Sequence, residues 1–416
     1  MSRLRLRLPR TLAPDVFTMA GVAFCVALGF GVVAPAIPLF ATAFGVSASA
    51  AGAVVSVFAL MRLVSGLAAG RLVDALGPRN TLVGGMAVVA VSSLLAGLAQ
   101  NYPQLLVLRG IGGVGSAVFG VASMSIVLHV TVRENRAQAM SVYRSGFLLG
   151  GILGPAIGGA VLGISLRAPF FLYAGTLGLA GAVALLFLGK PAADAPAPDA
   201  SAADASAGAG EEPDDPEPVG VPDLSLREVL RTPEYQAALS TNLAVGLAVF
   251  GLRSTIVPLL IVDHLGAAPG WVGIAFLVSA LIQTVLMFPA GRWSDTIGRR
   301  PVLVWGAMVS AGGLVLLAVG GSLLLVMVAM AVFGAGSAFL GSVPGALVGD
   351  VAGKRSGTVV AVFNMAGDLG SVIGPVLAGW LVDQGSYPAA FALGAAVVAG
   401  SGLFGLRLPR PAERSR

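Results

Sequence analysis

Twelve long runs of apolar residues recur along the 416-residue chain, and they constrain its fold more than any other feature. Each run is close to the roughly 20 residues that a helix needs to cross the hydrocarbon core of a bilayer. A helix satisfies its own backbone hydrogen bonds in lipid, and the runs lack the polar–apolar alternation of barrel strands. The sequence therefore predicts twelve membrane-spanning helices, near residues 15–40, 46–69, 81–99, 104–128, 138–163, 168–189, 236–261, 270–290, 301–319, 322–349, 357–382 and 388–407.

Charged residues are too scarce for a water-facing surface of this size. Only 11% of the residues are charged and 56% are hydrophobic, whereas a soluble domain carries about 25% charged residues. The formal net charge of +5 does not indicate nucleic-acid binding, because the basic residues lie in short clusters between the apolar runs. We therefore expect a protein of the inner (plasma) membrane whose partner is the lipid bilayer, with no nucleic acid.

Lys and Arg are distributed unequally between the two sides of the predicted helices. With the N-terminus in the cytoplasm, most of the 25 basic residues lie inside, and Arg167 alone lies outside. The positive-inside rule therefore predicts that both termini are cytoplasmic. The apolar stretch before Ala41-Thr42-Ala43 is longer than the core of a signal peptide, so we expect residues 15–40 to be retained as the first helix.

Residues 190–235 interrupt the helical pattern. They are rich in Pro, Ala and acidic residues, and such a segment cannot bury enough apolar surface to fold alone. We predict a disordered acidic cytoplasmic linker that acts as a spacer; a binding tail is the alternative. The predicted fold class is an all-α integral membrane protein with two pseudo-symmetric six-helix bundles, residues 1–189 and 236–416.

An internal repeat relates the two halves. Segments 70–79 and 291–300 share glycine, aspartate, glycine and arginine at an offset of 221 residues, as in Asp74 and Asp295. Segments 150–159 and 370–379 share the pattern G-x-x-x-G-P-x-x-x-G at an offset of 220 residues. Two unrelated motifs with nearly the same offset indicate parallel repeats, since six helices return the chain to the same side of the membrane.

Both motifs resemble those of the major facilitator superfamily. The G-x-L-x-D-x-x-G-x-R pattern at 70–79 is similar to the family's hallmark loop, and 150–159 is similar to a signature of its drug–proton antiporters. Segments 109–115 and 31–38 resemble its fourth-helix and first-helix motifs. The chain departs from the family at Ala75 and Pro78, which replace basic residues, and at Gly112, which replaces glutamine.

This resemblance implies a cytoplasmic gate and helices that bend. Asp74 and Asp295 are expected in cytoplasmic turns, where a carboxylate is stabilised by a helix N-terminus and can pair with a nearby arginine. The predicted gate comprises Gly70, Asp74, Gly77, Arg79, Gly291, Asp295, Gly298, Arg299 and Arg300. The predicted helix-bend motifs comprise Gly150, Gly154, Pro155, Gly158, Gly159, Gly374 and Pro375, because glycine permits close helix approach and proline removes a backbone hydrogen bond. Ordinary tight packing is the alternative for these glycines and prolines.

Charges inside membrane helices are costly and usually functional. Asp368 is the only acid well inside a predicted span, near the bilayer midplane, and we predict it to be the main proton-coupling carboxylate. Arg62 is its candidate partner, because helices two and eleven pack together in the resembled family; Arg109 and Arg144 are further candidates. The alternatives are a static salt bridge, and snorkelling of Arg62 and Arg144 to the membrane surface.

The remaining polar residues of the spans are expected to be structural. Arg253 is predicted near the outer surface, where it would snorkel. Asn242, Gln283 and Asn364 are predicted to bond neighbouring helices. The single cysteine, Cys25, is expected to behave as a small hydrophobic residue, and the isolated His129 and His264 make no metal site.

The sequence predicts a secondary active transporter rather than an enzyme. It contains no G-x-x-x-x-G-K-[ST] phosphate loop, and no Cys/His cluster or nucleophile motif. The resemblance implies a monomer whose further partners are a small-molecule substrate and protons. We expect no cofactor, with the proton gradient as the energy source. The predicted function is proton-coupled efflux of small, partly hydrophobic compounds by alternating access. A metabolite or sugar importer or facilitator on the same fold is the alternative, which the scarcity of polar residues in spans one, four, seven and ten disfavours.

Overall fold

Helices make up almost all of the computed structural model, which describes residues 13–131, 136–188, 226–351 and 356–408. Within these ranges twelve helical segments are long and apolar enough to cross a membrane, as predicted. The first half contains α1 (Pro14–Val33), α2 (Ala36–Thr42), α3 (Ala48–Leu76), α4 (Pro78–Gly97), α5 (Tyr102–His129), α6 (Arg136–Leu162) and α7 (Ala168–Phe187). The second contains α8 (Leu226–Val229), α9 (Pro233–Gly246), η4 (Leu247–Ile256), α10 (Val257–Leu259), η5 (Leu260–His264), α11 (Gly270–Thr296), α12 (Arg299–Val319), α13 (Leu323–Val351), α14 (Ser356–Asp383) and α15 (Tyr387–Gly405).

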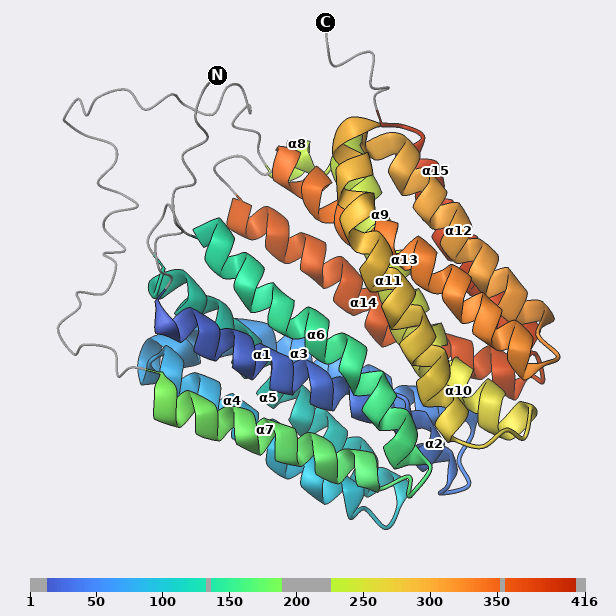
Figure 1. Ribbon diagram of the computed structural model, residues 1–416, viewed down its shortest axis with the longest axis horizontal. Coiled ribbons are helices and arrows are strands. Elements are labelled where there is room, and N and C mark those ends of the chain that lie inside the picture. The colour runs from blue at the N-terminus through green and yellow to red at the C-terminus, as the bar shows by residue number, and fades with distance from the viewer. Residues whose placement is uncertain (1–12, 132–135, 189–225, 352–355, 409–416) are drawn as a thin grey trace, which may run out of the picture.

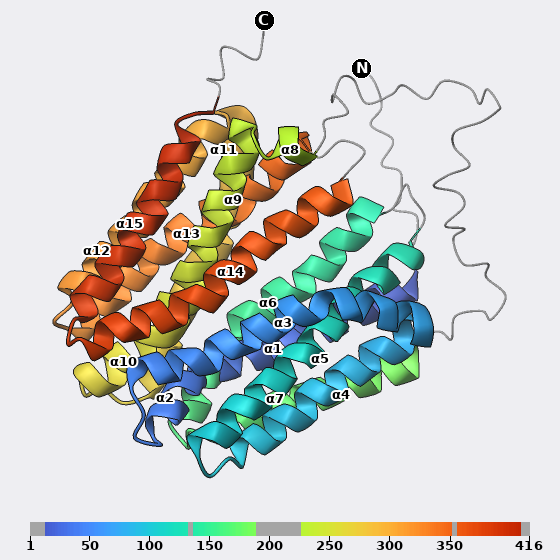
Figure 2. The same cartoon turned by 180° about the vertical axis from the view of Figure 1, so that it is seen from behind.

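The two halves form two bundles that lie side by side (Figures 1 and 2). They pack together mainly through α3 against α14 and through α6 against α11. The first and last described helices begin and end at the same end of the molecule, which we call the terminal end. The opposite end, at which α2 ends and α15 begins, is called the distal end. Figures 1 and 2 show the axes of the two bundles diverging towards the terminal end.

The first and seventh spanning segments are interrupted, which the apolar pattern did not reveal. The first breaks into α1 and α2 at Ala34 and Pro35, where proline lacks the N–H that would continue the helical ladder. The seventh consists of α9, η4, α10 and η5, and η4 is a ten-residue π-helix. Its wider turn lets Thr255 Oγ1 donate a 2.8 Å hydrogen bond to the carbonyl of Phe250, five residues earlier. Such π-helical segments are rare and are frequent at functional sites.

The second half begins earlier in the chain than predicted. Residues 226–235, which belong to the predicted linker, form α8 and the start of α9. Thr232 caps α9, because its hydroxyl accepts a hydrogen bond from the backbone N–H of Tyr235. A buried Tyr235 ring then anchors this end of the helix. The rest of the predicted linker, up to residue 225, lies outside the described residues.

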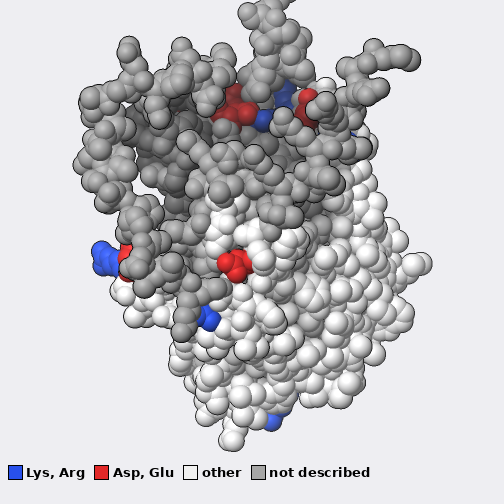
Figure 3. All heavy atoms as spheres, turned by 60° about the vertical axis from the view of Figure 1, so that its left-hand side comes forward, with Lys and Arg blue, Asp and Glu red and all other residues white. Residues whose placement is uncertain are grey.

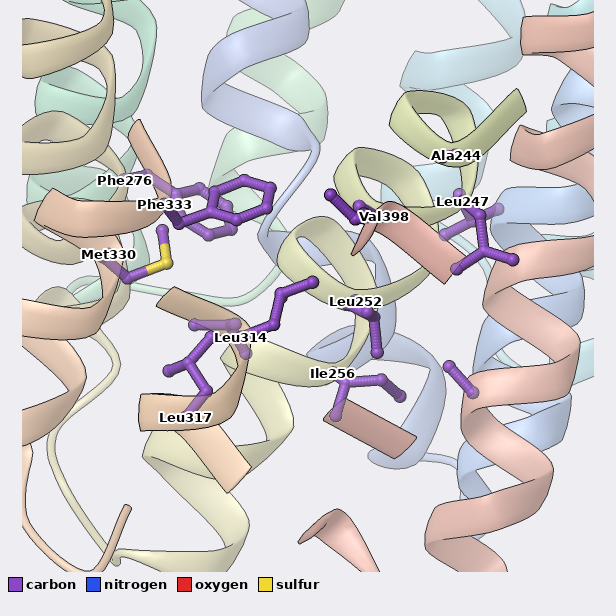
Figure 4. Close-up of a cluster of buried hydrophobic side chains, with 14 of the residues drawn as sticks. Ala244, Leu247, Leu252, Ile256, Phe276, Leu314, Leu317, Met330, Phe333 and Val398 are labelled. Carbon is purple, nitrogen blue, oxygen red and sulfur yellow. The ribbon is translucent and has the colours of Figure 1, made fainter. Parts of the chain in front are cut away.

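Apolar side chains lie both inside the bundles and on their outer faces. A buried cluster that draws on both halves includes Leu252, Ile256, Leu314, Met330 and Phe333 of the second half (Figure 4). The outer faces are also apolar, with Leu186 77%, Val319 73% and Leu324 75% exposed. Figure 3 shows a broad area of this surface without Lys, Arg, Asp or Glu. Such a surface is suited to lipid rather than to water.

Candidate functional site

A cavity of about 510 Å³ lies between the two halves. Both bundles supply its wall: α1, α3, α5, α6 and α7 from the first half, and η4 and α11 from the second. Its volume falls within the range of small-molecule sites. Most of its wall is apolar, and its aromatic residues are Phe30, Phe58, Phe119, Phe147, Tyr173, Phe250 and Phe276. We call this space the central cavity.

An ion pair joins the two halves at the border of the central cavity. The guanidinium of Arg62 on α3 donates a hydrogen bond to the Asp368 carboxylate on α14, so the structure pairs these two residues. Arg62 lines the central cavity, and both residues line an adjoining cavity of about 500 Å³. Ser116, Gly120 and Phe250 also line both spaces. The pair is therefore accessible from the space that a solute would occupy, and its role in proton coupling stays a prediction.

The other two arginines predicted for coupling have different environments. Arg109 is only 3% exposed, and its guanidinium carbon lies 4.4 Å from the centroid of the Phe58 ring. It lines a narrow pocket together with Arg62. Arg144 is exposed on α6 and lies three residues before Phe147, which lines the central cavity. Residues three apart share a helix face, so Arg144 lies on the cavity side of α6, closer to the terminal end.

The prediction that Arg253 snorkels to the outer surface is wrong. Arg253 lines the central cavity, its Nε atom is buried, and its guanidinium carbon lies 5.5 Å from the centroid of the Phe276 ring. The reason is its place in the π-helix η4, in a segment that continues for a further eleven residues to His264. The side chain is therefore too deep and faces the wrong way to reach the membrane surface.

The three uncharged polar residues also divide into two groups. Asn242 donates a 2.7 Å hydrogen bond to the carbonyl of Phe363, so it links α9 to α14 as predicted. Gln283 instead lines the central cavity, and Asn364 lines the adjoining one. Among the described residues, neither of these two side chains has a hydrogen-bond partner. Both amides are thus free to interact with a solute.

The repeated gate motif is mostly helical, which corrects the expectation that its aspartates lie in turns. Asp74 lies in the last turn of α3, and Asp295 lies in the last turn of α11. The chain reverses only at Gly77 (φ 78°) and Gly298 (φ 103°), before α4 and α12 begin. These positive φ angles explain why glycine occupies both positions. The two copies of the motif therefore adopt the same local structure.

The arginines of the gate motif bind within their own halves. Arg79 donates a hydrogen bond to the carbonyl of Leu185 on α7. Arg299 forms an ion pair with Asp350 and a 2.8 Å hydrogen bond to the carbonyl of Ala346, both on α13. Asp74 and Asp295 are exposed, and neither carboxylate has a partner among the residues that the structure describes. The bonds described for Arg79, Arg299 and Arg300 at the terminal end all lie within their own half.

Glycines of the helix-bend motif let helices approach within backbone contact. On α6, a Cβ at Gly150, Gly154 or Gly158 would lie 3.0 Å or less from the backbone of α1. On α14, Gly370 and Gly374 face the backbone of α9 and η4 in the same way. These contacts repeat at the same positions in both halves. The motif therefore provides close packing, and a bending role for Pro155 and Pro375 stays a prediction.

Contacts between the halves concentrate at the distal end. Gly159 on α6 meets the backbone of α11 at Gly273, and Gly379 on α14 meets the backbone of α3 at Ala48. Asp383, at the end of α14, accepts hydrogen bonds from the backbone N–H groups of Ala48 (2.7 Å) and Ser49 (3.0 Å). The final glycine of each repeated segment thus serves the interface between halves, and the molecule is closed at this end.

The sequence matches the family model described as "Major Facilitator Superfamily" twice, over residues 19–255 and 238–416. The chain belongs to the major facilitator superfamily. The resemblance seen in its motifs is therefore confirmed. It is a multi-pass membrane protein and a secondary transporter, in a family of transporters rather than enzymes.

Several characterised members of the family are similar over most of the chain. Multidrug resistance protein 2 of Bacillus subtilis (strain 168) is 26% identical over 390 residues, which are 91% of this chain and 92% of that protein. The quinolone resistance protein NorA of Staphylococcus aureus (strain MSSA476) is 24% identical over 374 residues, 89% of this chain and 90% of that protein. A crystal structure of the nucleoside transporter NupG superimposes with a TM-score of 0.73 at 12% identity, covering 94% of this chain and 98% of that one. The last likeness shows the shared fold.

Proposed function

We propose that this transporter exports small, partly hydrophobic compounds in exchange for protons. One observation carries the proposal: the Arg62–Asp368 ion pair joins the two halves at the wall of an aromatic cavity. An aromatic, apolar wall suits hydrophobic compounds that enter the cavity from the membrane. The similarity to proteins named for multidrug and quinolone resistance supports the direction of export.

The ion pair offers a way to couple protons to the motion of the halves. While Asp368 is ionised, its attraction for Arg62 favours the conformation in which α3 and α14 are held together. Proton uptake neutralises the carboxylate and removes this attraction, so the halves can rearrange around the cavity. The positive-inside rule predicts that both termini are cytoplasmic, and in that orientation the closed distal end would face outwards.

The alternative is a metabolite or sugar importer or facilitator on the same fold. Such a substrate would require many hydrogen-bonding groups in the cavity wall. The wall instead contains six phenylalanines, and its polar side chains are few. The nucleoside transporter resembles this chain in fold alone, at 12% identity, so it adds no support for import.

Transport in proteoliposomes tests the proposal. We expect purified protein to drive uptake or release of compounds from a panel only when a pH gradient is imposed. The Asp368→Asn variant should fold, should still exchange substrate down its own gradient, and should lose its response to the pH gradient. Asp263→Asn, which alters an exposed carboxylate outside the cavity, is the matched control.

The same variant separates coupling from a static salt bridge. A static bridge predicts that Asp368→Asn weakens the fold and exchange together, because Arg62 is left without its partner. Proton-driven transport that is unchanged in Asp368→Asn would end the coupling proposal. Transport that ignores the pH gradient in the unmodified protein would favour the facilitator.

A further inference from the structure

The central cavity contains more positive charge than negative charge. Arg62 is neutralised by Asp368, but Arg109 and Arg253 have no ion-pair or hydrogen-bond partner among the described residues. None of the described residues that line the central cavity is acidic. The space between the halves therefore holds two uncompensated guanidinium groups beside an aromatic wall.

Arg253 presents its charge directly to the central cavity. Its guanidinium lies over the ring of Phe276, which also lines the cavity. Phe276 belongs to the same buried cluster as Met330 and Phe333, which fixes the ring (Figure 4). The Nε atom of Arg253 is buried without a partner. The side chain is thus held in place by packing while its charge remains unpaired.

Arg109 repeats this arrangement in the first half. Its guanidinium lies over Phe58, and it lines a narrow pocket with Arg62 and Ser254 that adjoins the central cavity. Phe58 and Ser254 line the central cavity as well. Arg144 adds a third positive charge on the cavity side of α6, nearer the terminal end. A solute that enters from the terminal end would pass Arg144 before it reaches Arg253.

An unpaired cation inside a membrane protein is costly, and its field attracts anions strongly because the surroundings have a low dielectric constant. A guanidinium also binds a carboxylate through two parallel hydrogen bonds. The phenylalanines can hold an aromatic or aliphatic body next to that group. A lipophilic cation, in contrast, would meet no free carboxylate in this cavity.

We propose that the central cavity selects amphipathic anions, namely compounds with an aromatic or aliphatic body and one carboxylate, which Arg253 binds and Arg109 supports. This inference rests on the proposed function of the central cavity as the substrate site. It names the substrate class and does not depend on the coupling ion.

Three fluorescent probes with the same ring system test the proposal: 9-anthracenecarboxylate, its neutral carboxamide, and the cationic 9-(aminomethyl)anthracene. Binding to the full-length purified protein is measured by fluorescence titration. We expect the carboxylate to bind most tightly and the cation most weakly. Arg253→Gln should weaken binding of the carboxylate by about tenfold or more, and should leave binding of the carboxamide unchanged.

Two further variants keep the test decisive. Arg253→Lys retains the positive charge but cannot form the two parallel hydrogen bonds of a guanidinium. It should therefore bind the carboxylate more tightly than Arg253→Gln and more weakly than the unmodified protein. Arg167→Gln is the matched control, since Arg167 also lies over a phenylalanine ring, that of Phe40 at 5.7 Å, but does not line the central cavity. Arg109→Gln should act in the same direction as Arg253→Gln; if it fails to fold, Arg253→Gln alone decides.

Several outcomes would overturn the proposal. They are equal or tighter binding of the cationic probe, equal loss of all three probes in Arg253→Gln, and no binding of the carboxylate up to its solubility limit. Failure of the proposed function gives a different pattern. Selective anion binding without proton-driven transport would refute proton coupling alone, whereas proton-driven transport of the cationic probe would refute the anion selectivity alone.

Discussion

A single carboxylate, that of Asp383, ties the two halves together at the distal end. It accepts hydrogen bonds from the backbone N–H groups of Ala48 and Ser49, which begin α3 in the other half. The first N–H groups of a helix have no partner within the helix, and a negative charge there is favourable. Asp383 therefore stabilises the closed distal end, which the repeated motifs did not indicate.

We predict that Asp383→Asn opens the distal end. An amide carries no negative charge and has one acceptor oxygen, so it cannot replace both hydrogen bonds to Ala48 and Ser49. Spin labels at Ser165 and Ala268, on opposite halves of the distal end, should report a longer mean distance in this variant. Asp263→Asn is the control at the same end. An unchanged distance distribution in Asp383→Asn would show that other contacts keep this end closed.

For single charged residues, the sequence predicted the depth in the membrane but not the direction in which the side chain faces. Asp368 was found because an acid in the middle of an apolar run is rare, and its pairing with Arg62 was expected from the helix packing of the resembled family. Depth alone did not give the facing direction of Arg253, which is followed by Ser254 and Thr255 in an otherwise apolar run. The π-helix η4 then changes the direction of each side chain relative to an α-helix.

At the scale of helices, the repeated glycines of α6 and α14 determine how closely these two helices pack against their neighbours. We predict that Gly154→Ala destabilises the protein, because a Cβ at this position would lie 2.7 Å from the carbonyl oxygen of Leu28 on α1. Overpacking of this kind costs about 1–3 kcal/mol. The thermal melting temperature of the purified protein measures the effect.

Gly178→Ala on α7 is the matched control for this prediction, since a Cβ there has no neighbour within 4 Å. Alanine favours a helix over glycine by about 1 kcal/mol, so this variant should be as stable as the unmodified protein or more so. Equal melting temperatures for Gly154→Ala and Gly178→Ala would mean that α1 and α6 can move apart at no cost.

The gate motif should matter for turnover more than for stability. Asp74 and Asp295 are exposed and unpartnered in the described part of this conformation, so Asp74→Asn and Asp295→Asn should leave the melting temperature nearly unchanged. Both should slow transport if the carboxylates bind across the halves when the terminal end closes. Asp295→Asn is expected to be the more damaging, since Ala75 and Pro78 weaken the first copy. Wild-type rates in both variants would argue against a gate at this position.

Most helix boundaries were predictable to within about three residues, because length and apolar content decide which segments can cross a membrane; the exceptions are α3 and α11, which continue past the predicted ends at 69 and 290 to Leu76 and Thr296. The interruptions were not predictable from those properties. Pro35 breaks the first span into α1 and α2, and the π-helix widens the seventh. Both irregular segments lie next to the central cavity, which is lined by Ala34 and Phe250 among others. Local departures from a regular helix thus occur where the solute would bind.

At the scale of the whole molecule, the repeat explains both the closed end and the position of the site. The last glycines of the two repeated segments, Gly159 and Gly379, each contact the opposite half at the distal end. At the terminal end, Arg79 and Arg299 of the two motif copies bind to helices of their own half. Contacts between the halves at the distal end, and bonds within each half at the terminal end, are consistent with the asymmetry that alternating access requires. The direction of transport then depends on which side of the membrane the terminal end occupies.

We predict that the terminal end is cytoplasmic, because most Lys and Arg residues lie on that side of the predicted helices. On a Cys25→Ala background, a cysteine at Ser165 in the distal loop should react with a membrane-impermeant maleimide on intact cells. A cysteine at Ser206, in the predicted linker, should react only after the membrane is permeabilised. In that orientation the closed distal end blocks the outside, and the cavity loads from the cytoplasm as export requires. Labelling of the linker cysteine on intact cells would reverse the topology and, with it, the proposed direction of transport.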